Sequence, residues 1–301
     1  MQHTQPKYAL LENVRNLATH DKGNTWKVIH QHLVAIGYNV LCDPVIFSPH
    51  YLGIPQHRER VYIMCIRKDV GELPKFIFNK DKLPKCCIDD ILQNDEEITN
   101  IEQYKLSKDK IALLDLWDEF IKNIKVEKIP SFPIWSDYLK VLDTSEDLSK
   151  YPKWKINFIL KNNQLYLSNK EFIDNWLIRA KKNHLFFGSK AKLEWQAGQC
   201  ENPNLWDNIL QFRPSGIRVK NGTYFPALVA ITQTSIIGKR KRFLTLRECA
   251  RLQSFPDTFQ YDVKKAQAYK QFGNSINVGL VSFFARYMFG DKELQHRHRA
   301  G

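Results

Sequence analysis

The amino-acid sequence predicts an α/β fold, and three observations near its start lead to that prediction. Residues 8–11 form a short apolar run, and residues 20–37 place apolar side chains at helical spacing. The stretches 38–47 and 60–67 are rich in β-forming residues, and a connection with proline and glycine joins them, so we expect them to pair antiparallel. One helix and three strands make half of an open sheet, so residues 1–69 are expected to be a partial α/β domain.

A carboxylate ends the first predicted strand. Residues 8–11 are typical of a short buried strand, and Glu12 follows at its carboxyl end. Open α/β sheets place binding and catalytic groups at the carboxyl ends of their strands. Considered alone, Glu12 is more simply a strand-end carboxylate that faces water, so other motifs have to decide its role.

Residues 70–241 have a different composition, with six of the seven tryptophans and several lysine-rich stretches. Helical periodicity appears over 107–124 and again over 169–182. Asn221-Gly222 between alternating runs predicts a β-hairpin. This mixture predicts a separate α+β region.

Helices return after this region. Residues 242–291 contain one predicted helix that ends at Pro256 and an apolar helix from about 276 to 289. The last ten residues, 292–301, form a basic tail rich in histidine and arginine. We therefore divide the chain into four parts, at 1–69, 70–241, 242–291 and 292–301.

The charge balance points to a polyanionic partner. Lysine and arginine number 45 against 32 acids, a formal charge of +13, which favours nucleic acid. No apolar run approaches the length of a membrane span, and no signal peptide opens the sequence. The six cysteines show no C-x-x-C spacing, so we expect no metal site. The apolar or helical surroundings of Cys65 and Cys249 suit reduced thiols in the cytoplasm.

Four segments together closely resemble motifs of the bacterial cytosine-5 DNA methyltransferases. They are ENV at 12–14, QHRER at 56–60, LTLRECARLQSFPDTF at 244–259 and YKQFGNSINV at 269–278, in the order that the family carries them. The resemblance implies the last three strands of a class I S-adenosylmethionine-dependent methyltransferase sheet. It also implies that 70–241 is the target-recognition domain, which reads double-stranded DNA.

The resemblance assigns roles around the first two motifs. The family adds a cysteine thiolate to C6 of cytosine, transfers a methyl group from S-adenosylmethionine to C5, and then eliminates the thiolate. By this resemblance, Glu12 is the acid that protonates N3 of the base. The resemblance also implies that Arg60 binds O2 of the cytosine. Arg58 is expected to pair with Glu12 or another nearby acid. Asn13 is expected near the DNA, and Gln56 near the DNA or the catalytic loop. The target base has to leave the duplex.

Recognition of the DNA sequence is expected within 130–235. The resemblance continues there, and the candidates for contacts with base edges are Arg213, Arg218, Lys220, Thr232 and Thr234. Methylation of RNA by a relative of the family is the more distant alternative, and the length of the recognition region favours duplex DNA.

The last motif implies a contribution to the cofactor site. Asn274 and Ser275 follow Gly273 at a predicted helix break, and the resemblance places them near the methionine end of S-adenosylmethionine. A plain turn, with Ser275 capping the next helix, is compatible with that role.

The segment before it is expected to be mainly architectural. Arg247, Arg251 and Gln253 are expected to support the recognition region. Arg247 and the run 238–242 are also candidates for phosphate contacts.

Two family motifs have no counterpart here. The sequence contains neither the Phe-x-Gly-x-Gly cofactor loop nor the Pro-Cys-Gln loop that supplies the nucleophile, and none of its cysteines follows a proline. Without a thiolate no covalent adduct can form, so we expect this chain to be inactive by itself.

Three interpretations of this chain remain open. The chain could be one subunit of a split restriction–modification methylase, with the missing motifs on a second polypeptide that shares the cofactor. It could instead be a truncated, inactive remnant, or a sequence-specific DNA-binding module without catalysis. The intact motifs on both sides of the recognition region favour the split enzyme.

Overall fold

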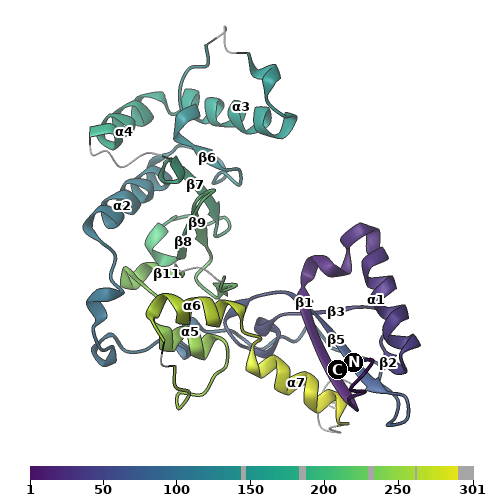
Figure 1. Ribbon diagram of the computed structural model, residues 1–301. Coiled ribbons are helices and arrows are strands. Elements are labelled where there is room, and N and C mark those ends of the chain that lie inside the picture. Colours follow the sequence, from purple (N-terminus) through teal and green to yellow (C-terminus); the bar gives the residue numbers. More distant parts are fainter. Residues whose placement is uncertain (144–146, 183–187, 230–233, 262, 291–301) are drawn as a thin grey trace. The chain divides into compact units, whose positions relative to one another are not determined.

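The structure is a computed structural model that describes residues 1–143, 147–182, 188–229, 234–261 and 263–290. The chain forms two compact units. The first comprises the described parts of 1–92, 226–232 and 246–301, and the second those of 93–225 and 233–245. Figure 1 labels elements of both units where there is room.

The elements of the first unit come from both ends of the chain. They are β1 (Tyr8–Val14), α1 (Asn24–Ala35), β2 (Tyr38–Val40), β3 (Val45–Phe47), β4 (Gln56–His57), β5 (Arg60–Arg67), α5 (Leu246–Leu252), α6 (Lys265–Asn274) and α7 (Val278–Met288). The short strand β10 (Phe225–Pro226) lies where the chain passes from one unit to the other.

Strand β5 is the centre of the sheet in the first unit. It pairs antiparallel with β1 on one side and with both β2 and β3 on the other. Residues 41–44, which include Pro44, separate β2 from β3, and proline cannot donate a ladder hydrogen bond. The predicted antiparallel pairing of 38–47 with 60–67 is confirmed.

Two helices cover the faces of this sheet, and Figure 1 shows α1 and α7 on opposite sides of it. The side chains of β5 alternate between them. Val61, Ile63 and Cys65 pack in the cluster that contains Trp26 of α1. Tyr62, Met64 and Ile66 pack in the cluster that contains Phe284 of α7. The result is a three-layer α/β arrangement.

Strand β1 differs from the sequence prediction of a buried strand. None of its residues is buried, and among the described residues β5 is its only hydrogen-bonded neighbour. Leu11 is 36% exposed and Val14 is 53% exposed. An edge strand has a neighbouring strand on one side only, so β1 is more exposed than the predicted buried strand.

The first unit also extends beyond the predicted boundary at residue 69. Leu73, Phe76 and Phe78 pack against the cluster around Phe47. These apolar contacts hold the segment that follows β5 on the first unit, so the division between the units falls at residue 92.

The second unit is built on a six-stranded sheet with the order β12-β11-β8-β9-β7-β6 among the described residues. Its elements are α2 (Lys108–Asn123), β6 (Ile134–Trp135), α3 (Lys153–Ser168), α4 (Lys170–Lys182), β7 (Lys192–Gln196), β8 (Ile209–Arg213), β9 (Gly216–Lys220), β11 (Ile236–Ile237) and β12 (Arg242–Phe243). Trp117 of α2 and Trp176 of α4 are fully buried against one face of this sheet. The helices predicted over 107–124 and 169–182 are confirmed.

The hairpin predicted at Asn221-Gly222 is wrong. Strand β9 pairs antiparallel with β8, and the tight turn lies at 214–215 because Arg213 is opposite Gly216. Asn221 instead accepts a hydrogen bond from the backbone N–H of Thr223 at 3.0 Å. This local turn ends β9 without returning the chain along it.

Candidate active site

Glu12 and Arg60 lie side by side on neighbouring strands. Arg60 is paired in register with Val14, so Glu12, two residues earlier, projects from the same face of the sheet. The Nε of Arg60 lies 3.0 Å from Oε1 of Glu12, and about one-fifth of each side chain is exposed (20% and 18%). The pairing of β1 with β5 thus holds the two side chains together, and both remain partly accessible to solvent.

Arg58 is bound elsewhere, which corrects the expectation that it pairs with Glu12. Its guanidinium donates to the carbonyl oxygens of Leu228 at 2.9 Å, Gly273 at 3.0 Å and Ser275 at 3.3 Å. Arg58 is 6% exposed, and this burial, followed by the nearby charge of Arg60, lowers its pKa. The side chain therefore joins three segments that are far apart in the sequence.

Gln56 and Asn13 have opposite environments. Gln56 is fully buried, and both polar atoms of its amide group lack a hydrogen-bond partner among the described residues. Asn13 is exposed, and its side-chain oxygen accepts from the N–H of Val14 at 2.8 Å. Asn13 is free to meet another molecule, whereas Gln56 is enclosed by the protein.

Sequence reasoning missed Tyr62. It follows Arg60 by two residues on β5 and is opposite Glu12 in the ladder. Its ring stacks on Phe284 with centroids 4.5 Å apart. Burial and the nearby Glu12 carboxylate raise the pKa of its hydroxyl group, so this phenol stays protonated. The period-two spacing from Arg60 was the signal that could have identified it.

The last motif lies at the junction of α6 and α7. Asn274 is exposed at the end of α6, and the Ser275 hydroxyl donates to the carbonyl of Phe272 at 2.9 Å. The N-cap of α7 is Asn277, whose Oδ1 accepts from the N–H of Leu280 at 3.1 Å. The expectation that Ser275 caps this helix is therefore wrong.

The three residues that were expected to support the recognition region instead contact other parts of the first unit. Arg251 pairs with Asp257 at 2.7 Å, and Gln253 donates to the carbonyl of Phe272 at 3.1 Å. Arg247 donates to the carbonyl of Phe259 at 3.1 Å.

Within the run 238–242, Arg242 is fully buried and its Nε lies 2.9 Å from Oδ1 of Asp95. This burial excludes Arg242 from the expected phosphate contacts. Lys239 and Lys241 of the same run are exposed.

Three of the candidate recognition residues share one face of the second unit's sheet. The register places Arg213, Arg218 and Lys220 at alternate positions on the face opposite the core. Burial, together with the charges of Arg218 and Arg213, lowers the pKa of Lys220.

The remaining candidates do not extend this group. Thr234 is half-buried, and Thr232 and the basic tail at 292–301 lie outside the described residues.

Neighbouring strands add residues to this face that sequence reasoning missed. Glu194 of β7 is opposite Arg218, and the two charged groups approach to 2.6 Å. Gln211 of β8 is opposite Arg218 on the other side. We call Glu194, Gln211, Arg213, Arg218 and Lys220 the polar sheet face. Its members come from three strands, so only the pairing register brings them together.

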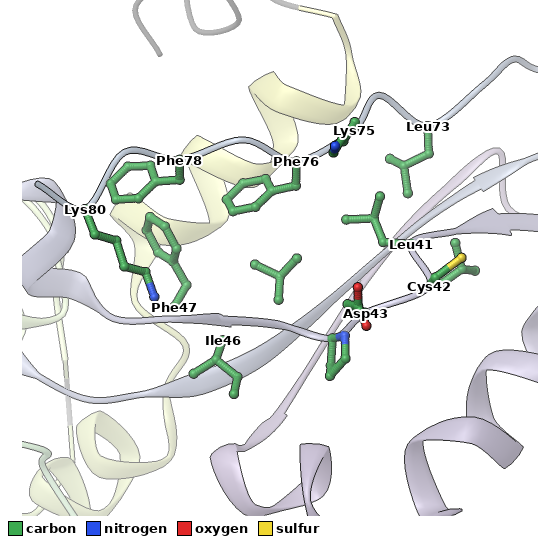
Figure 2. A pocket seen from close by; sticks show the side chains of 13 residues that line it. Leu41, Cys42, Asp43, Ile46, Phe47, Leu73, Lys75, Phe76, Phe78 and Lys80 are labelled. Carbon is green, nitrogen blue, oxygen red and sulfur yellow. The ribbon is translucent and has the colours of Figure 1, made fainter. Parts of the chain in front are cut away.

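A pocket of about 620 Å³ lies on the other side of β5 from β1. It opens between residues 40–47 and the extended segment 73–80, and Figure 2 shows Phe76 and Phe78 projecting toward Phe47. Phe47 and Phe78 are in contact, with ring centroids 4.6 Å apart. No residue of the four motifs lines this pocket, so it is separate from the Glu12–Arg60 pair.

Two of the six cysteines are enclosed by the protein. Cys65 is fully buried on β5 toward α1, and burial raises the pKa of its thiol to about 12. Cys249 is also fully buried. Neither thiol can reach a base in this structure.

The described residues form neither a metal centre nor a membrane span. No group of three or more His, Cys, Asp and Glu side chains is arranged there to hold a metal ion. None of the described helices has the length and apolar character that a membrane span requires.

Comparison with known proteins identifies the family. The C-5 cytosine-specific DNA methylase family matches residues 1–290. The chain therefore belongs to the C-5 cytosine-specific DNA methylases.

Several relatives are type II methyltransferases. M.AluI of Cellulosimicrobium cellulans is 31% identical, with 95% of this chain and 71% of the relative covered. M.HgiCI of Herpetosiphon aurantiacus is 28% identical, with 96% and 74% covered. Among solved structures, the Entamoeba histolytica methyltransferase EhMeth has a TM-score of 0.43 and 18% identity, with 95% of this chain and 63% of that chain covered.

Proposed function

We propose that this chain is the base-binding and DNA-recognition part of an S-adenosylmethionine-dependent DNA (cytosine-5-)-methyltransferase of a restriction–modification system. The pair of Glu12 and Arg60, 3.0 Å apart, carries the proposal. N3 and O2 are neighbouring atoms on one edge of cytosine. A carboxyl group and a guanidinium held side by side can therefore bind both atoms at once.

In the proposed reaction a thiolate forms a bond to C6 of a flipped cytosine. Glu12 delivers a proton or a strong hydrogen bond to N3, where negative charge develops, and Arg60 donates to O2. Bound S-adenosylmethionine supplies the methyl group that joins C5. Loss of the C5 proton, cleavage of the C6–S bond with release of the thiolate, and return of the N3 proton to Glu12 then restore the aromatic base.

The cofactor segment fits this reaction in part. The exposed side chain of Asn274 is free to contact S-adenosylmethionine. The hydroxyl of Ser275 is engaged by Phe272, and its carbonyl by Arg58. We propose that Asn274 makes the contact and that Ser275 holds the turn.

We propose further that a second polypeptide completes the catalytic domain. It would carry the Phe-x-Gly-x-Gly and Pro-Cys-Gln motifs and pair with the open edge of β1. In that arrangement β1, the β2–β3 pair and β5 are the last three strands of a class I methyltransferase sheet. The exposed apolar side chains of Leu11, Val14 and Phe289, which is 63% exposed, support a partner at this edge.

Co-purification tests this proposal. The chain is expressed with and without a candidate partner that carries both motifs, and transfer of a labelled methyl group to a pool of duplex DNA is measured. We expect transfer by the complex and none by the chain alone. The cysteine-to-serine variant of the partner's Pro-Cys-Gln loop should form the complex without activity.

A measurement of DNA binding by the chain by itself, made beside the transfer experiment, separates a DNA-binding module from an inactive remnant. A stable chain that prefers one DNA sequence, without methylation in any complex, would indicate a binding module. A chain that aggregates or binds DNA without preference would indicate a remnant. Transfer of methyl groups by the chain alone would contradict the proposal.

A further inference from the structure

Ser48 occupies a fully buried position directly after β3. Its hydroxyl oxygen accepts a hydrogen bond from the backbone N–H of Arg58 at 3.0 Å and lies 2.8 Å from Nδ1 of His50. A serine hydroxyl has one proton to donate and two lone pairs to accept, so both contacts can exist together.

The first of these contacts continues the β3–β5 ladder. The last residue pair of that ladder is Phe47 with Arg60. Beyond it the Ser48 hydroxyl, instead of a backbone carbonyl, accepts the N–H of Arg58. Arg58 is thus fixed at its main chain by Ser48 and at its guanidinium by the carbonyls of Leu228, Gly273 and Ser275.

His50 is held on the other side of Ser48 by aromatic contacts. Its ring lies 4.3 Å from the ring of Tyr51 and stacks on His57 at 5.0 Å between centroids. Burial, and then the nearby His57, lower the pKa of His50 to about 4, and Glu59 opposes this shift while Lys80 adds to it. The ring is neutral at pH 7 and can accept the Ser48 proton at Nδ1, which leaves an oxygen lone pair for Arg58.

We infer that Ser48 and His50 are positioning residues for the base-binding arginine, Arg60. They touch neither the proposed base nor Glu12. They act by fixing Arg58, two residues before Arg60, so that the Arg60 guanidinium is held against Glu12. The inference rests on the proposed function, because it assigns the two residues to the same site.

The first test needs no catalytic activity. Amide hydrogen exchange is measured on the chain by itself, in wild type and in Ser48→Ala, with Ser107→Ala as the matched control, because Ser107 accepts a hydrogen bond from Lys110 N–H at 3.4 Å in the second unit. We expect exchange at Arg58 to rise about tenfold in Ser48→Ala only, as one local hydrogen bond is lost. Unchanged exchange at Arg58 would overturn the inference.

The second test uses the complex with its partner. In Ser48→Ala and His50→Ala we expect kcat to fall about tenfold or more, because small displacements of an orienting group cost rate. His50→Asn keeps an acceptor near the place of Nδ1 and should recover most of that loss, which a merely structural role would not explain. Full kcat in both alanine variants, or no recovery in His50→Asn, would overturn the inference.

The two tests separate the claims. If the wild-type complex transfers no methyl group, the proposed function fails, and the Arg58 exchange still decides whether Ser48 holds the arginine segment.

Discussion

The Nε of Arg60 lies 3.0 Å from Oε1 of Glu12, across two antiparallel strands that share one face of a sheet. The ladder between β1 and β5 fixes this distance, because Val14 is opposite Arg60 and Glu12 is opposite Tyr62. An acid and a planar donor are therefore presented together, at the end of a strand whose other edge is open among the described residues.

Glu12→Gln should remove the proton donor while keeping the shape of the side chain. In the complex with the partner we expect methyl transfer to fall by about 10²–10⁴-fold, the usual range for loss of general acid catalysis. Binding of DNA should change little, which a gel-shift titration would show. Glu59→Gln is the control, because Glu59 pairs with the exposed Arg15, and a loss as large in this variant would contradict the role of Glu12.

Arg58→Met should destabilise the first unit. It leaves three carbonyl acceptors without their donor in a buried place, and we expect a loss of about 3 kcal/mol in the free energy of unfolding. Arg58→Lys should recover only part of this free energy, since one ammonium group cannot reproduce the planar array of donors of a guanidinium. Arg15→Met is the control, because its side chain is 64% exposed. Equal urea midpoints for Arg58→Met and Arg15→Met would show that the hydrogen bonds from Arg58 to the three carbonyls do not stabilise the unit.

Acid should weaken the first unit through His50. The pKa of His50 is about 4 in the folded chain against an ordinary value of 6.5. The unfolded chain therefore binds the proton more readily, and the stability of the unit falls as the pH falls from about 6.5 to 4. His50→Asn cannot titrate and should lose less stability over this range. Urea denaturation followed by the β5 amide signals measures it, and identical pH profiles would refute the prediction.

The polar sheet face should bind DNA through Arg213 and Lys220. If the native side chain contacts a base edge, alanine at its position should weaken binding to the recognised duplex by about 1–3 kcal/mol. A contact with phosphate would instead reduce the slope of log K against log salt by about 0.9. Lys181→Ala, on the exposed side of α4, is the control.

Arg218 should behave differently from its neighbours. Arg218→Ala leaves the Glu194 carboxylate, 2.6 Å from its lost partner, facing the DNA. Adding Glu194→Gln should then restore part of the binding. No restoration in the double variant would contradict the assignment of this face to DNA.

The open edge of β1 should control assembly. Leu11→Lys places a charge on an already exposed position, so the chain by itself should keep its stability, while capture of the partner should fall at least tenfold. Val28→Lys, at a 63% exposed site on α1, is the matched control. Equal capture by both variants would place the partner elsewhere.

Much of the local structure could be predicted from the sequence. The periodicity of 20–37, 107–124 and 169–182 predicted α1, α2 and α4, because an apolar stripe at helical spacing specifies both the element and its buried side. The antiparallel pairing with β5 followed from the connection between the strands. Glu12 and Arg60 were identified by motif, and the structure places them together.

The remainder depends on contacts between distant segments. The spacing of Arg58 and Arg60 could not decide which of them meets Glu12, because the carbonyls of Leu228, Gly273 and Ser275 settle that choice. A carbonyl acceptor leaves no signal in the sequence. The exposure of β1 depends likewise on which strands are its neighbours, and the polar sheet face depends on pairing register.

The most direct test of the central claim uses duplex DNA that contains 5-fluorocytosine. Fluorine at C5 cannot leave as a proton does, so the bond between the attacking thiol and C6 persists and marks the chain that supplied the nucleophile. We predict that the complex traps the DNA on the partner, that this chain carries no adduct, and that Glu12→Gln in this chain lowers the yield. DNA attached to one of this chain's own cysteines would contradict the account.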